Sequence, residues 1–267
     1  MNDSSPRHAA PLLEVDHQIT GAGPIAVYGH GLFSSRAVER RQGVFDWSPI
    51  VSAGFSLVRY DARGHGRSPG SRDPADHTFA ARGGHLLRLL DHLGATRPVH
   101  ALGSSMGSAA VLWAAVTAPE RFGRLVLVIP PTAWEARAES AATYRQWAEE
   151  TARGGAGAWA AEQAAADPPP VLAEVPGYAH RPDVAEDLLP AVLRGAAASD
   201  LPAPEALRAL THPTLVLCWE KDPGHPVATG HRLAGLLPNA RLEVAGTLRE
   251  IRTWGAAAAA FLREEAA

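Results

Sequence analysis

Short apolar runs alternate with longer segments of helical periodicity along most of the chain. Runs of four to six mostly apolar residues, the usual length of a buried strand, lie at 12–17, 24–28, 56–60, 98–102, 124–129, 214–219 and 241–244. Segments with helical periodicity lie at 39–52, 78–93, 105–118, 226–237 and 254–264. Because strands that alternate with helices form β-α units, the pattern predicts an α/β fold with a doubly wound, mostly parallel sheet.

This alternation breaks between residues 130 and 210, a stretch rich in Ala, Glu, Arg and Trp. It contains three consecutive prolines at 168–170 and several helical segments, but no convincing strand. Its three tryptophans need burial, which favours a packed unit over a flexible linker. We therefore predict a helical lid at 131–210, inserted in a core domain formed by 1–130 and 211–267.

Composition and charge narrow the classes of protein. The formal net charge is −3 and the arginines are spread along the 267 residues, so neither nucleic acid nor an anionic membrane is expected as a partner. No apolar stretch approaches the ~20 residues that span a bilayer. Cys218 is the only cysteine, which suits a reducing compartment. Since the N-terminus lacks the features of a secretory signal, we expect a cytoplasmic monomer or homodimer that acts on a small molecule.

A serine framed by glycines is the most informative motif. Gly103-Ser104-Ser105-Met106-Gly107 follows the apolar run at 98–102 and opens a helical segment. This strand-turn-helix context is that of a nucleophile elbow, in which the turn strains the serine and the glycines let the helix pack closely on the strand. Ser105 is therefore the candidate nucleophile.

A nucleophilic serine also needs donors for the oxyanion that develops on the substrate. The turn after the second apolar run begins His30-Gly31-Leu32 and offers the backbone N–H of Leu32. The residue after the nucleophile, Met106, offers a second N–H at a helix N-terminus. An ordinary turn at a strand end would look the same in isolation, but its register with the elbow favours an oxyanion hole.

No cofactor is expected. The histidines are scattered singly, and no cluster of His, Cys, Asp and Glu has the spacing of a metal site. Gly29-x-Gly31 and Gly64-x-Gly66 lack the further glycine and acidic residue of a dinucleotide site.

Together these motifs resemble the α/β-hydrolase superfamily, in particular its lidded esterases, lactonases and haloperoxidase-like members. The resemblance covers nearly all of the chain outside the predicted lid, and the matching segments stand in the family's order at 29–31, 60–68, 103–107, 222–226 and 233–240. It implies that Asp222 orients the catalytic base and that Asp61, Arg63 and His65 belong to the scaffold. Glu135 is a weaker alternative for the acid, because some hydrolases carry it after the preceding strand.

The catalytic histidine is missing from its usual place in the family. The loop after the last apolar run spans 244–250 without an imidazole, and no histidine follows His231. Since a serine without a base is a weak nucleophile at neutral pH, another group must replace it or the chemistry has changed. The best replacement is His225, at the carboxyl edge of the sheet three residues beyond Asp222. It could instead be a half-exposed loop residue. His231 falls on the following helix, and His77 could cap a helix or reach the cleft.

The sequence therefore predicts a cofactor-free serine hydrolase of a small or medium apolar ester, thioester or lactone. Two alternatives remain open. If the base is truly lost, the same pocket could serve a lyase, dehydratase or cyclase, with Ser105 as a hydrogen-bond donor. A catalytically weak ligand-binding protein on the same fold is the other.

Overall fold

The structure is a computed structural model that describes residues 15–175, 178 and 182–264. One seven-stranded sheet runs through it in the order β1-β3-β2-β4-β5-β6-β7. Only β1 is antiparallel to its neighbour, and every other pair is parallel. The strands are β1 His17–Thr20, β2 Ile25–Gly29, β3 Ser56–Tyr60, β4 Val99–Ser104, β5 Phe122–Val128, β6 Thr214–Trp219 and β7 Ala240–Ala245.

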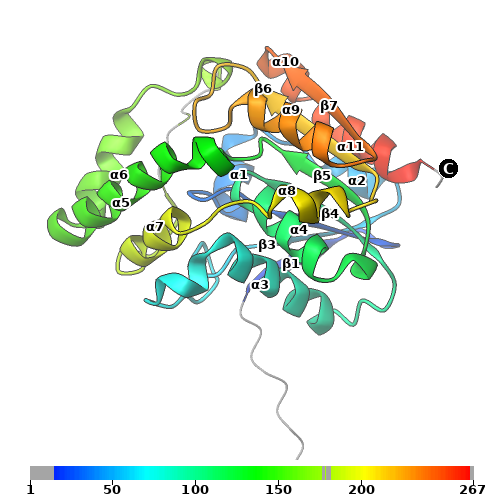
Figure 1. Cartoon of the computed structure of the whole chain (residues 1–267), viewed down its shortest axis with the longest axis horizontal. Coiled ribbons are helices and arrows are strands. Elements are labelled where there is room, and N and C mark those ends of the chain that lie inside the picture. Colours follow the sequence, from blue (N-terminus) through cyan, green and yellow to red (C-terminus); the bar gives the residue numbers. More distant parts are fainter. Residues whose placement is uncertain (1–14, 176–177, 179–181, 265–267) are drawn as a thin grey trace, which may run out of the picture.

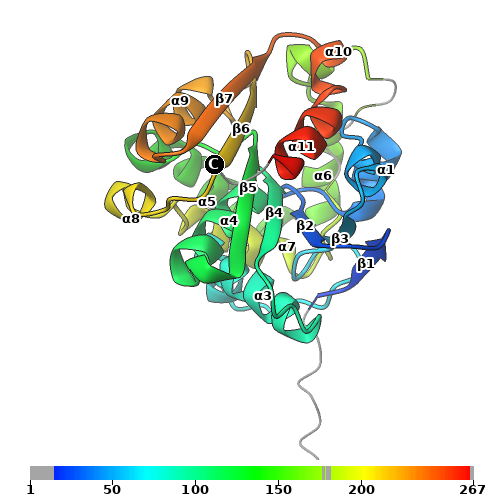
Figure 2. The ribbon, with the colours of Figure 1, turned by 90° about the vertical axis from the view of Figure 1, so that its right-hand side faces the viewer.

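Helices cover both faces of the sheet, which confirms the predicted doubly wound architecture (Figures 1 and 2). The helices of the core are α1 Arg36–Gln42, α2 Ser48–Ser52, α3 Phe79–His92, α4 Met106–Thr117, α9 Val227–Leu236, α10 Leu248–Ile251 and α11 Trp254–Arg263. In Figure 2, α3, α4 and α9 lie on one side of the strands, and α1 and α11 on the other.

Side chains of each central strand alternate between two hydrophobic clusters, as the pleat of a sheet requires. On β5, Leu125 and Leu127 belong to the cluster under α3, α4 and α9, whereas Val126 and Val128 belong to the cluster under α2 and α11. These four residues are fully buried. Because both faces of the parallel strands are covered, the strands appear in the sequence as continuous apolar runs rather than as alternating ones.

Two predicted elements differ in the structure. The strand expected at 12–17 begins at His17 and runs to Thr20, pairing with β3 at an edge of the sheet. Its residues are mostly exposed and polar, so hydrophobicity could not mark it, and 12–14 lie outside the described residues. The helix expected at 39–52 is two helices, since Gly43 ends α1 in the left-handed conformation and α2 begins at Ser48, directly before Pro49.

Among the described residues between β5 and β6, where the sequence predicts a helical lid, the structure has four α-helices besides two short 3₁₀ helices. The α-helices are α5 Arg137–Gly154, α6 Ala156–Ala165, α7 Leu189–Ala197 and α8 Pro204–Arg208. Helices α5, α6 and α7 group together at one side of the molecule (Figure 1). We call residues 131–210 the helical insertion, and its behaviour as a separate lid domain stays a prediction. Among the described helices, none is both long and apolar enough to cross a membrane.

Candidate active site

Ser105 sits at a strained turn between β4 and α4. Its backbone has φ 50° and ψ −110°, a conformation that costs free energy in a non-glycine residue. A Cβ on Gly103 would overlap the carbonyl group of Gly107, and a Cβ on Gly107 would overlap the carbonyl oxygen of Gly29. The two glycines of the motif therefore let α4 begin directly against β4 and β2, which leaves Ser105 at the carboxyl edge of the sheet.

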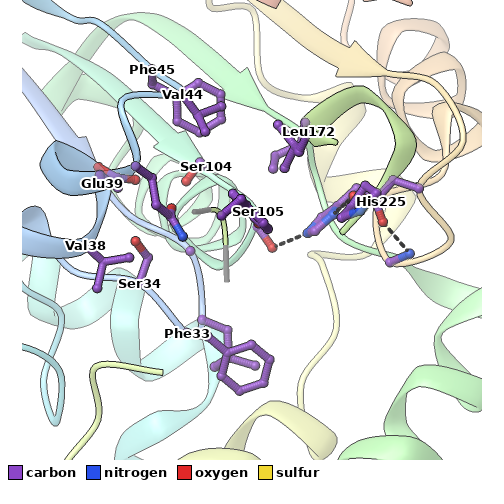
Figure 3. A pocket seen from close by; sticks show the side chains of 18 of the residues that line it. Phe33, Ser34, Val38, Glu39, Val44, Phe45, Ser104, Ser105, Leu172 and His225 are labelled. Atoms are coloured by element: carbon purple, nitrogen blue, oxygen red, sulfur yellow. Dashed lines mark hydrogen bonds and ion pairs between the residues drawn. The ribbon is translucent and has the colours of Figure 1, made fainter. Parts of the chain in front are cut away.

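Ser105, His225 and Asp222 form one hydrogen-bonded chain. The Ser105 hydroxyl Oγ lies 2.7 Å from Nε2 of His225, and Nδ1 of the same ring lies 2.8 Å from Oδ2 of Asp222. Because an ionised carboxylate can only accept, the ring proton sits on Nδ1, which leaves Nε2 free to accept from the serine. Figure 3 shows the contact between Ser105 and His225 across the floor of the pocket. The arrangement is that of a nucleophile, a base and an orienting acid.

The loop after β6 brings Asp222 and His225 together through its own hydrogen bonds. The backbone N–H of His225 donates to the carbonyl of Asp222, and the N–H of Gly224 donates to the Asp222 carboxylate at 2.9 Å. The N–H of Thr132, after β5, donates to the Gly224 carbonyl and ties the loop to the neighbouring strand end. This compact turn points an imidazole three residues after the acid back toward the serine.

Asp222 is ionised in this setting. Burial would raise the pKa of its carboxyl group, but His225, the Trp219 indole N–H and the Gly224 amide outweigh burial and lower the pKa well below its usual value. Its side chain is 8% exposed and that of His225 24%, so the charge faces the imidazole rather than solvent.

The predicted oxyanion turn lies beside the nucleophile. Gly31 and Leu32 line the same pocket as Ser105, and a Cβ on Gly31 would lie 3.7 Å from the Cβ of Ser105. Met106 is the first residue of α4, so its N–H has no partner inside the helix. Within the described chain, neither the Leu32 nor the Met106 N–H donates to a protein acceptor. The oxyanion role of the two amides stays a prediction.

Two buried histidines hold that turn. His30 Nε2 accepts from the Ala62 N–H at 2.9 Å, so its proton is on Nδ1 and is donated to the Gly31 carbonyl. Burial lowers the pKa of His30 to about 4, which keeps the ring neutral. His65 Nε2 lies 2.6 Å from the carbonyl oxygen of Leu32, and burial, followed by the charge of Arg82, lowers the pKa of His65 well below its usual value. Gly31 and Leu32 are thus fixed by their carbonyls, and their N–H groups have no partner among the residues that the structure describes.

A cavity of about 290 Å³ opens over Ser105. Its walls come from three parts of the chain: the turn and helix after β2, the strand ends after β4, β5 and β6, and the helical insertion. Figure 3 shows Phe33, Val44, Phe45 and Leu172 around the serine. Apolar and aromatic side chains predominate, with a few polar groups such as Ser34, Gln42 and Gln163. Such a cavity fits a small or medium ligand.

Comparison with known proteins agrees with this geometry. The family model described as alpha/beta hydrolase fold matches residues 24–248. The chain belongs to the α/β-hydrolase family. The enol-lactonase of Burkholderia xenovorans LB400 has the same fold, with a TM-score of 0.71 at 24% identity over 94% of this chain and 96% of that one.

Curated relatives of this α/β hydrolase carry several activities. A 3-oxoadipate enol-lactonase of Acinetobacter baylyi is 27% identical over 71% of this chain and 70% of its own length. An epoxide hydrolase of Caballeronia sordidicola is 34% identical over 38% of this chain and 30% of its own length. Several relatives match over only about a third of their length. The relatives support a hydrolase.

Other candidates from the sequence lie away from the site of this α/β hydrolase. Glu135 is exposed and pairs with Arg232 of α9, so it does not take the place of the acid. His231 is exposed on α9. His77 is buried with its Nε2 2.7 Å from the Ser71 carbonyl. Asp61 accepts from the backbone N–H groups of Arg36 and Arg67, as a scaffold residue does.

Sequence reasoning missed most of the pocket wall of this α/β hydrolase. Tyr144 and Trp147 of α5 line the cavity, although helical spacing favours the interior of the lid over a pocket wall for such aromatic residues. Phe45 reaches the cavity because α1 ends at Gly43. That glycine is the one signal in the sequence from which this position of Phe45 could have been predicted. Ile129 and Trp219 follow the strand-end rule, since ligands bind beyond the carboxyl ends of parallel strands. In the described residues no cluster of His, Cys, Asp and Glu could hold a metal ion.

Proposed function

We propose that this protein is a cofactor-free serine hydrolase that cleaves small or medium apolar esters, thioesters or lactones. The observation that supports the proposal most is the hydrogen-bonded chain from Ser105 through His225 to Asp222. Activity on ester bonds would also agree with the named enol-lactonase relative, whereas the epoxide hydrolase relative acts on another bond.

The proposed reaction assigns each step to a group at or beside Ser105. Ser105 Oγ attacks the substrate carbonyl while His225 Nε2 accepts its proton, and the Asp222 carboxylate stabilises the imidazolium that forms. The Leu32 and Met106 amides donate to the oxyanion. His225 then returns the proton to the leaving alcohol, thiol or ring oxygen, and a water molecule activated by the same ring releases the acid.

In this proposal the catalytic histidine comes from a different loop than is usual in the family, but it has the same role. The loop after β7 holds Thr247, whose hydroxyl caps α10 in a capping box with Glu250, and Leu248, which is buried. This segment therefore serves to start a helix and fill the core. His225 of the loop after β6 supplies an imidazole in hydrogen-bonding contact with both the serine and the acid.

The test is labelling with a fluorophosphonate, read as intact mass, together with hydrolysis of p-nitrophenyl esters of increasing chain length. The native protein should gain one adduct and turn over the esters, and Ser105→Ala should do neither. Equal ester hydrolysis by native protein and Ser105→Ala would contradict the proposal. No adduct from folded native protein would favour the lyase or the ligand-binding alternative.

A further inference from the structure

The Asp222 carboxylate has a third partner besides His225 and the Gly224 amide. The indole Nε1–H of Trp219 donates to Asp222 Oδ2 at 2.8 Å, the same oxygen that accepts from His225. The other oxygen, Oδ1, accepts from Gly224. Both oxygens are therefore occupied, and the plane of the carboxylate is fixed relative to the imidazole.

The Trp219 N–H adds a constraint on the orientation of the Asp222 carboxylate, which stands on a short loop. Asp222 and His225 are separated by only two residues, so the acid and the base cannot rely on two separate strand ends for their alignment. A carboxylate on a short loop can rotate about its terminal bond, where the torsion is broad. A donor on Oδ2 from the end of β6 adds to the Gly224 amide on Oδ1 and restricts that rotation further.

The direction of the indole N–H is set by aromatic packing. Trp219 is 4% exposed, and its ring lies nearly parallel to those of Phe45 and Trp254, with centroids 6.0 and 6.1 Å away. Phe45 comes from the segment between α1 and α2, and Trp254 from α11. The indole is thus held by two other parts of the fold while its N–H donates to the acid.

Two tyrosines also face the acid, from other elements. Burial raises the pKa values of both Tyr144, in α5, and Tyr178. For Tyr178 the negative charge of Asp222 adds to this effect, because it disfavours the phenolate. For Tyr144, burial dominates over the opposing charge of Arg137. Neither tyrosine gains or loses a proton near neutral pH, so they do not account for a change in activity there.

We propose that Trp219 is a positioning residue, whose indole N–H holds the Asp222 carboxylate in the orientation that lets His225 act as the base. The inference rests on the proposed serine-hydrolase function. Since Trp219 also lines the cavity, a loss of activity alone would not separate positioning from substrate packing.

The test is Trp219→Phe, which keeps an aromatic ring but removes the N–H together with the five-membered ring of the indole. We expect kcat to fall about tenfold, in the range of one hydrogen bond to a charged group. Without the indole donor the carboxylate is no longer held toward the ring and stabilises the protonated imidazole less, so the ascending limb of kcat/KM against pH should move downward by about 0.5 pH unit. A limb that stays in place or moves to higher pH would overturn the inference.

The matched control is Trp254→Phe, which alters the same ring stack but touches no acid. It should lower the melting temperature and leave the ascending limb unchanged. A shift equal to that of Trp219→Phe would show that packing, not the hydrogen bond, sets the limb. The proposed serine-hydrolase function has a test of its own, since activity that persists in Ser105→Ala would contradict that function whatever the Trp219 variants show.

A second measurement does not depend on folding of the Trp219 variant. In native protein labelled with ¹⁵N-tryptophan, the Trp219 indole proton should resonate downfield of the other tryptophans and move on Asp222→Asn. The Trp254 signal should not move. An unchanged Trp219 signal in Asp222→Asn would overturn the inference.

Discussion

At the scale of single residues, the site depends on His225 standing where a loop imidazole can contact both serine and acid. His225→Gln removes the base and keeps a polar side chain of similar size. We expect kcat/KM to fall by about 10² or more, the range of general base catalysis. Steady-state kinetics with a p-nitrophenyl ester measures the loss. His231→Gln, on the exposed face of α9, is the control and should retain native activity. Equal activity in both variants would remove His225 from the mechanism.

A second prediction at this scale concerns the glycines of the elbow. Gly107→Ala places a methyl group on the Gly29 carbonyl, and backbone cannot move aside as a flexible side chain could. We expect a loss of about 3 kcal/mol in the free energy of unfolding, as for overpacked cores, together with a misplaced Ser105.

Urea unfolding and fluorophosphonate labelling measure the two effects of Gly107→Ala. Gly235→Ala is the matched control, because a Cβ on this glycine of α9 meets nothing within 4 Å. It should be neutral or stabilising by up to about 1 kcal/mol. If Gly107→Ala were as stable as Gly235→Ala, close helix-strand packing would not explain the motif.

At the scale of elements, Arg137 connects helices of the helical insertion with one another and with the core. Its guanidinium donates to the carbonyls of Ser199 and Ala196, at the end of α7, at 2.9 and 2.7 Å. It also lies over the rings of Phe79 in α3 and Tyr144 in α5, 4.9 and 5.3 Å from their centroids. A buried cation is thus balanced by helix-end carbonyls and aromatic faces.

Arg137→Met should destabilise the protein by about 3 kcal/mol, because it leaves buried carbonyls without donors. It should also raise KM more than it lowers kcat, since Tyr144 lines the cavity but is not part of the hydrogen-bonded chain of Ser105, His225 and Asp222. Thermal unfolding and steady-state kinetics test the two parts. Arg153→Met, with a side chain 74% exposed, should change neither. An unchanged KM in Arg137→Met would contradict the expectation that Arg137 supports the cavity wall through Tyr144.

At the scale of the whole molecule, buried neutral histidines make stability depend on pH. Burial lowers the pKa of His30 to about 4 and also lowers the pKa values of His65, His77 and His100. The unfolded chain takes up protons below about pH 6.5, whereas the folded chain does not until its lowered pKa values are reached. The full stability is therefore present above pH 6.5 and is lost as pH falls toward 4.

His30 alone should remove about 3 kcal/mol over that interval, by linkage. Glu39, whose pKa burial raises, opposes this trend in part. Urea unfolding at pH 7.5, 6.0 and 5.0 gives the slope. His100→Gln should reduce it, and His92→Gln, on an exposed position, should not. Stability that does not change between pH 7.5 and 5.0 would contradict the prediction.

The sequence by itself determined the sheet and the strained turn at Ser105, because these depend on local signals, whereas the role of Asp222 as the acid stays a prediction. Apolar runs bounded by turns gave the strands from β2 to β7 to within two residues at each end, and glycine spacing located Ser105. The polar edge strand β1 and the break at Gly43 lacked a strong periodic signal. Helical spacing also could not tell which aromatic side chains of the insertion face its interior and which face the substrate.

Only the tertiary structure decided which imidazole meets Ser105. The serine and His225 are 120 residues apart in the chain, and their contact depends on the order of β4, β5 and β6 in the sheet. Sequence spacing could place His225 near Asp222, but not turn it toward the serine. That direction comes from the hydrogen bonds of the loop and from the Thr132 amide after β5, which donates to Gly224 from a segment that is distant in the sequence.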